Sequence, residues 1–139
     1  MTIHSSIADL DLSAVHRDLV TRSGKTEAEA AAAVVQYRKF LELVRRHRGA
    51  PICPPAAADE AWHHHIQRTV AYRRDCMALF GRFIDHDPDA FGTEVFRTAW
   101  AQTVLLWRLA FDEDLVEDAD ALGAGANAPS MCYLPPLAA

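Results

Sequence analysis

The sequence predicts an all-α protein: a compact bundle of about four helices with a flexible C-terminal tail. Three observations support this prediction. Apolar residues recur at three- and four-residue spacing, no segment alternates as a half-buried strand would, and glycine and proline divide the chain into helix-length pieces. We expect one helical domain over residues 1–115 and an acidic, glycine-containing tail over residues 116–139.

Two helices are expected in the first third of the chain. Residues 7–20 carry apolar side chains at roughly helical spacing, and Gly24 follows as a stop signal. Thr26 and Glu29 then form a capping box that begins a second helix, which runs to the basic residues before Gly49. The basic run 45–48 is typical of a solvated helix end, because cations complement the negative end of the helix dipole; an anion site is the alternative.

Two further helices are expected after residues 50–55, where three prolines exclude a helix interior. We expect one unbroken helix over residues 56–81, ended by Gly81, and then a turn around Pro88. A fourth helix should begin at residue 89 or 93 and end near residue 113. Its expected apolar face consists of Val95 or Phe96, Trp100, Thr103, Leu106 or Trp107, and Phe111.

Composition and charge argue against several classes of partner and cellular location. The net charge of −5 argues against nucleic acid and against an anionic membrane surface, because both reward clustered Lys and Arg. The chain has no run of about 18 apolar residues that would span a bilayer, and its first ten residues lack the apolar core of a secretory signal. The three cysteines form no CxxC pair, so we expect free thiols in a reducing cytoplasm.

Residues with chemically useful side chains concentrate between positions 59 and 87. If this segment is a straight helix turning about 100° per residue, two neighbouring stripes face inward. The first stripe carries Asp59, His63, Ile66 and Val70, and the second carries Trp62, His65, Thr69, Tyr72 and Cys76. The opposite side, which we expect to face water, carries His64, Arg68 and Asp75.

Asp59 and His63 are the candidate metal ligands, because an aspartate and a histidine four residues apart on a helix can share an ion. The candidate ions are zinc, iron, copper and manganese. One ion cannot hold both His63 and Cys76, which lie about 20 Å apart on a straight helix. His86 returns easily to Cys76 but reaches His63 only with strain or if the helix bends. The remaining candidate binding residues are Trp62, His65, Tyr72, Cys76 and His86.

Each of these residues also has a structural interpretation. Asp59 can cap the helix start, Cys76 can be a small buried hydrophobe, and Trp62 and Tyr72 can be core residues. The sequence contains no phosphate loop and no HExxH motif, so kinase and zincin functions have no support. We assign no residue a catalytic role.

Several motifs together resemble the glycine-rich-domain-containing-protein-like family of plants and bacteria. In this chain they are Phe40-Leu41, Asp59-Glu60-Ala61-Trp62-His63-His64-His65, Tyr72-Arg73-Arg74-Asp75-Cys76, Phe80-Gly81, His86-Asp87-Pro88 and Thr103-Val104-Leu105-Leu106-Trp107 with Phe111. The resemblance covers roughly residues 34–115 and implies a small helical domain, but it transfers no established activity. Relatives often continue into Gly-rich or Cys-rich segments, whereas this chain offers only Gly123, Gly125 and Cys132 there.

Two hypotheses follow. The first is a compact helical protein with a His/Asp/Cys polar site that binds a metal or carries out catalysis. The second is a non-catalytic interaction module, in which the polar residues form a structural hydrogen-bond network. In that case Trp62, Trp107 and residues 131–137 would contact a protein partner or a second copy of the chain.

Overall fold

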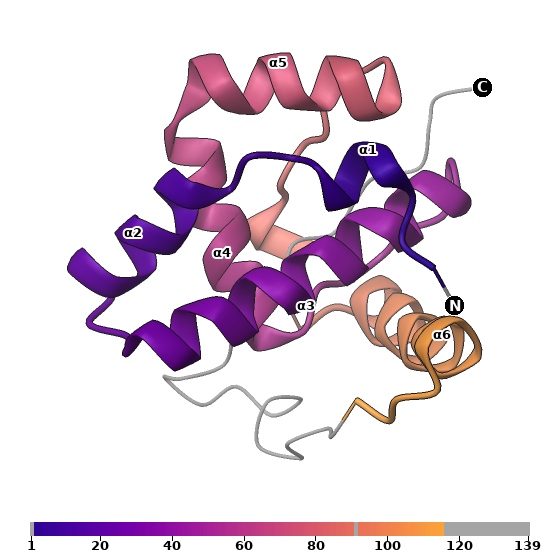
Figure 1. Ribbon diagram of the computed structural model, residues 1–139. Coiled ribbons are helices and arrows are strands. Elements are labelled where there is room, and N and C mark those ends of the chain that lie inside the picture. Colours follow the sequence, from indigo (N-terminus) through magenta and orange to yellow (C-terminus); the bar gives the residue numbers. More distant parts are fainter. Residues whose placement is uncertain (1, 91, 116–139) are drawn as a thin grey trace.

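Helices account for most of the described chain. A computed structural model describes residues 2–90 and 92–115, and in these ranges it has six α-helices, one short 3-10 helix and no strand (Figure 1). In chain order these are α1 (Ser5–Ala8), α2 (Ser13–Thr21), α3 (Glu27–Arg46), α4 (Ala56–Gln67), α5 (Thr69–Phe80), η1 (Pro88–Ala90) and α6 (Glu94–Phe111). The all-α prediction is therefore confirmed. The predicted tail lies outside the described residues.

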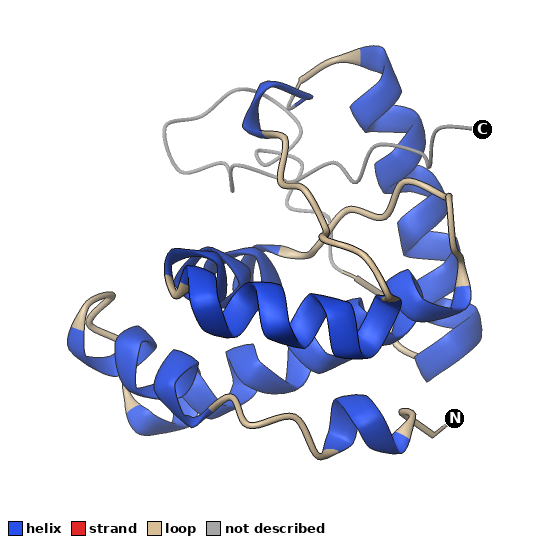
Figure 2. Cartoon of the chain, turned by 90° about the horizontal axis from the view of Figure 1, so that it is seen from above, coloured by secondary structure: helices blue, strands red, loops and turns tan. Residues whose placement is uncertain are grey.

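The helix α3 is the one around which the first half of the protein packs, since α1, α2 and α4 all contact it. Its capping box is present as predicted: Thr26 Oγ1 accepts from the Glu29 amide at 3.1 Å, and Glu29 Oε1 accepts from the Thr26 amide at 3.1 Å. Its predicted apolar face is buried at Tyr37, Phe40 and Val44. Figure 2 shows the same helices from above, joined by loops, with no strand among the described residues.

The single helix predicted over residues 7–20 is wrong, because α1 and α2 are separate helices joined by residues 9–12. The physical reason lies at Asp11, whose carboxylate accepts hydrogen bonds from the amide (3.0 Å) and the hydroxyl (2.6 Å) of Ser13. Such local bonds offer the backbone an alternative to helix continuation. The loop still turns Leu12 into the core.

The unbroken helix predicted over residues 56–81 is also wrong. The chain leaves the helical conformation at Arg68 (φ −92°, ψ 70°), and α5 turns away from α4 at that point (Figure 1). The Arg68 guanidinium donates to both carboxylate oxygens of Asp18 on α2, at 2.8 and 2.9 Å, which holds the bend. The break carries Val70, expected to face inward, to 84% exposure.

The helix α6 and the proline-rich connector are joined by one buried hydroxyl. Thr103 Oγ1 accepts from the Cys53 amide at 3.0 Å and donates to the Ala99 carbonyl at 2.8 Å. The predicted inward face of α6 is confirmed at Phe96, Trp100 and Trp107. None of the helices in the described ranges combines the length and the apolar character needed to cross a membrane.

Candidate metal centre

The bend at Arg68 brings two distant parts of the sequence together. Asp59 and His63 lie one turn apart on α4, and His86 lies on the loop that follows α5. One possible ligand atom from each of these three residues lies within 4.8 Å of the other two, and the described part of the chain has no other such group of three. From the sequence, we expect His86 to lie near Cys76 if the helix is straight and to reach His63 only with strain or if the helix bends. The helix bends, and His86 lies beside His63.

The donor atoms of this group point at a common volume. The Nε2 atoms of His63 and His86 are 2.5 Å apart, so one must donate a proton to the other. Asp59 Oδ2 lies 3.5 Å from the His63 Nε2, and Asp59 Oδ1 lies 3.9 Å from the His86 Nε2. An ion with bonds of about 2.0–2.2 Å holds its ligand atoms roughly 3–3.5 Å apart. A small outward rotation of the two rings would therefore admit one ion.

Electrostatics favour the form of histidine that binds metals. Burial is the main cause that lowers the pKa of His63, and the nearby His64 lowers it further. Burial also lowers the pKa of His86, with His63 as the second cause. Both rings therefore remain neutral to lower pH than an ordinary histidine, and the neutral imidazole is the ligand form. The His63 side chain is 37% exposed, so the group opens to solvent on that side.

Trp62 and Tyr72 hold the loop that carries His86. The Trp62 Nε1 donates to the Tyr72 hydroxyl at 2.9 Å, and that hydroxyl donates to the Ile84 carbonyl at 2.6 Å, two residues before His86. The Trp62 ring also lies against the His86 ring, with centroids 5.1 Å apart. These two predicted binding residues therefore act through the position of His86, and both are buried.

His65 belongs to a separate hydrogen-bond chain. Its Nδ1 pairs with the Tyr37 hydroxyl at 2.7 Å and its Nε2 pairs with Asp75 Oδ2 at 2.9 Å. Burial lowers the pKa of His65 and outweighs the opposing effect of Asp75. Because both ring nitrogens are engaged, His65 does not join Asp59, His63 and His86. It links α3, α4 and α5 instead.

Cys76 also lies outside the group of three ligands. Its thiol is buried, and this burial raises its pKa, although the Ile84 backbone and the Tyr72 side chain partly counter the effect by hydrogen bonding. A buried thiol with a raised pKa is a poor nucleophile. Cys76 thus packs beside the loop that carries His86, in agreement with its interpretation as a small buried hydrophobe.

Two residues expected to face water are buried. His64 is 8% exposed and its Nε2 pairs with the Ser23 hydroxyl at 2.6 Å, while Asp75 is 6% exposed and pairs with His65. The error for Asp75 follows from the straight-helix projection, which fails beyond Arg68. His64 lies before the bend and is buried because the turn after α2 packs against it. The signal for Asp75 was its place beside Cys76 in the Tyr-x-x-Asp-Cys motif.

Comparison with known proteins agrees with the resemblance seen in the motifs. Residues 7–122 match the family model described as UCP032817-like. The chain is also similar to glycine-rich domain-containing protein 1 of Arabidopsis thaliana, at 29% identity over 86 residues. That match covers 57% of this chain and spans only 10% of the plant protein. No solved structure matches the chain. Since the family match extends from the first helix beyond the last, the chain belongs to the UCP032817-like family, with the glycine-rich domain-containing protein as a relative.

Proposed function

We propose that this protein binds one divalent transition-metal ion through Asp59, His63 and His86. The observation that carries the proposal is the convergence of one carboxylate oxygen and two imidazole nitrogens within 4.8 Å. Two nitrogen donors and one oxygen donor suit zinc and iron, and three protein ligands leave positions for water or a substrate. The neutral state favoured by the lowered pKa values of both histidines supports the same function.

Because three protein ligands leave coordination positions open, we extend the proposal to catalysis by the bound ion. In catalytic sites an ion held by three protein ligands activates water or polarises a substrate. The partial exposure of His63 provides access from solvent. Asp59 is buried at the other side of the group, where its carboxylate would balance the charge of the ion.

The test is the metal content of the purified protein and of three variants. We expect near-stoichiometric metal in the wild type by plasma mass spectrometry. Asp59→Asn, His63→Ala and His86→Ala should each reduce it to trace levels while circular dichroism shows unchanged helix content. His47→Ala is the matched control, because His47 caps α3 outside the ligand group.

His86→Ala is the decisive variant. A run of three histidines can chelate metal by itself, and that run consists of residues 63–65. If His86→Ala keeps its metal, the run is the chelator and the proposed centre is wrong. If it loses the metal and His47→Ala does not, the three-residue centre is supported.

The second candidate function is a non-catalytic interaction module. The specific observation in its favour is the outer face of α6, where Leu105 and Leu109 are 56% and 70% exposed. The buried chains through Tyr72 and His65 would then serve only to fix the helices. Under this alternative the wild type holds trace metal, and light scattering detects an assembly that Leu105→Glu and Leu109→Glu disrupt.

A further inference from the structure

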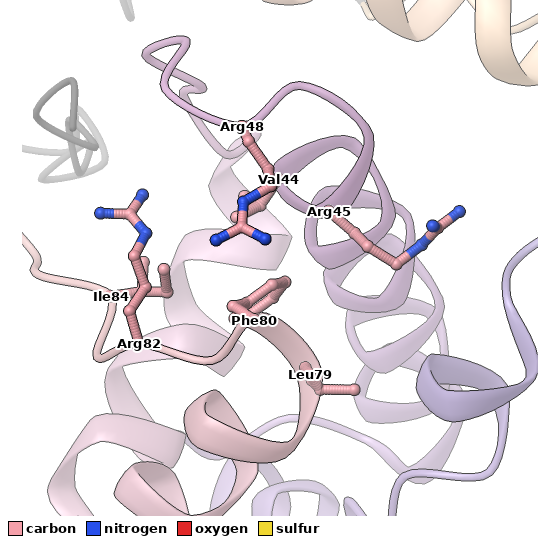
Figure 3. Close-up of a pocket in the computed structure, with 7 residues that line it drawn as sticks. All are labelled: Val44, Arg45, Arg48, Leu79, Phe80, Arg82 and Ile84. Carbon is pink, nitrogen blue, oxygen red and sulfur yellow. The ribbon is translucent and has the colours of Figure 1, made fainter. Parts of the chain in front are cut away.

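A second group of polar side chains lies outside the metal centre, at the point where α3 and α5 end. A pocket of about 40 Å³ opens there, and its walls come from the last turn of α3, the last turn of α5 and the loop after each (Figure 3). Val44, Phe80 and Ile84 form its apolar floor, and all three are buried. Arg48 and Arg82 lie at its rim.

The arginines of this pocket differ in what they contact. Arg45 is committed to the fully buried Glu42, at 2.7 Å, and its guanidinium points away from the pocket in Figure 3. Arg48 and Arg82 form no ion pair with any carboxylate of the described ranges, and their guanidinium groups lie above Phe80 on the same side. The two come from segments 34 positions apart in the sequence, so only the fold brings them together.

A structural role at the helix ends does not account for both charges. Two helices end here, and each C-terminus carries roughly half a negative charge. Arg48 and Arg82, which pair with no carboxylate among the described residues, carry two full positive charges, and this leaves about one positive charge in excess. The apolar floor keeps water from one side of the pocket, so an anion there is held more strongly than at an open surface.

We propose that this pocket binds a phosphate group, either as inorganic phosphate or as the monoester of a small molecule. Two guanidinium groups supply forked donors and a charge that matches a phosphate dianion better than a carboxylate. The pocket volume of about 40 Å³ is several times the roughly 10–15 Å³ that one water needs, so the pocket has room for part of an oxyanion whose other atoms face solvent. The pocket shares the loop of Ile84 with the proposed metal centre, but none of its lining residues is a proposed metal ligand.

Isothermal titration of the full chain at constant ionic strength tests the proposal. The probes are inorganic phosphate, glycerol phosphate, acetate and chloride. We expect phosphate to bind, with Arg48→Ala and Arg82→Ala each weakening it by about tenfold or more, since a charged hydrogen bond contributes that much. Arg17→Ala is the matched control, because Arg17 is exposed on α2 and does not line the pocket.

The outcomes separate cleanly. Tighter binding of glycerol phosphate than of inorganic phosphate identifies a monoester as the ligand, and equal binding identifies the free ion; both support a phosphate site. If acetate or chloride binds as well as phosphate, or if Arg17→Ala weakens phosphate as much as Arg82→Ala does, the proposal is wrong. Arg82→Lys should retain the fold and bind with intermediate affinity, because it keeps the charge and loses the fork. Wild-type affinity in that variant would also contradict the role of Arg82.

Discussion

Tyr72→Phe removes one hydroxyl that two buried groups share. The Trp62 Nε1 donates to it at 2.9 Å and it donates to the Ile84 carbonyl at 2.6 Å. Leaving a buried polar group unpaired costs about 1–3 kcal/mol, so two such groups should cost about 2–6 kcal/mol in the free energy of unfolding. That is a large part of the roughly 5–15 kcal/mol that stabilises an ordinary domain. Urea denaturation followed by tryptophan fluorescence measures this loss directly.

The same substitution should weaken metal binding, because the Ile84 carbonyl anchors the loop that carries His86. The matched comparison is Tyr37→Phe, which breaks the bond to His65 Nδ1 and leaves the link from Trp62 through Tyr72 intact. We expect Tyr37→Phe to lose about 1–2 kcal/mol of stability with metal affinity unchanged. A Tyr72→Phe variant that unfolds within about 0.5 kcal/mol of the wild type would refute this account of the loop.

Three further predictions concern the interactions around the bend. The buried His65 has a lowered pKa, so the unfolded chain takes up this proton at a higher pH than the folded protein does. The contribution of His65 to the free energy of unfolding should therefore be full above about pH 6.5 and fall by up to about 1.4 kcal/mol per pH unit below it. Urea midpoints of the metal-free protein at pH 7.5 and 5.0 will measure this loss. Arg68→Ala should cost about 1–3 kcal/mol, because it leaves the buried Asp18 carboxylate without its bidentate partner, and thermal unfolding will report the loss. Thr103→Val should cost about 1–3 kcal/mol by leaving the Cys53 amide unpaired, as measured by urea unfolding.

Each of these predictions has its own control. His65→Gln should reduce the pH dependence of stability between pH 7.5 and 5.0 without abolishing it, because the lowered pKa values of His63 and His86 act in the same direction. An unchanged slope would assign the whole effect to those two residues. Arg73 is exposed on α5 and pairs with no carboxylate of the described residues, so Arg73→Ala should change stability by less than about 0.5 kcal/mol. Thr98→Val, an exposed substitution on α6, should be similarly neutral.

Local signals in the sequence predict the starts of α3, α4 and α6 and the connector. The Thr26 capping box, the prolines of residues 50–55 and the apolar face of α6 each depend on neighbours within one or two turns, and the structure has all three. The break at Arg68 carries no such signal. No glycine or proline stands there, and the bend depends instead on Asp18, which lies 50 positions away in the sequence.

The error at Arg68 explains most of the errors that follow it. A projection onto one straight helix turns every residue after the break to the wrong side, which is why Val70 was expected inside and Asp75 outside. It also kept His63 and His86 apart. Residue types and spacing single out Asp59 and His63 as candidate ligands, but only the tertiary contact of Arg68 explains how His86 comes to lie beside them.

The proposed metal centre depends on the bend at Arg68, but the bend does not depend on a metal ion. On a straight helix His65 and Asp75 would lie about 15 Å apart, yet they form a 2.9 Å bond, and Trp62 reaches Tyr72 across the same ten-residue interval. Both bonds, and the Arg68 pair, form between protein groups and require no ion. Asp59, His63 and His86 are therefore brought together by the protein alone. If they bind the proposed ion, removing it should leave the bend in place, whereas removing the bend should abolish metal binding.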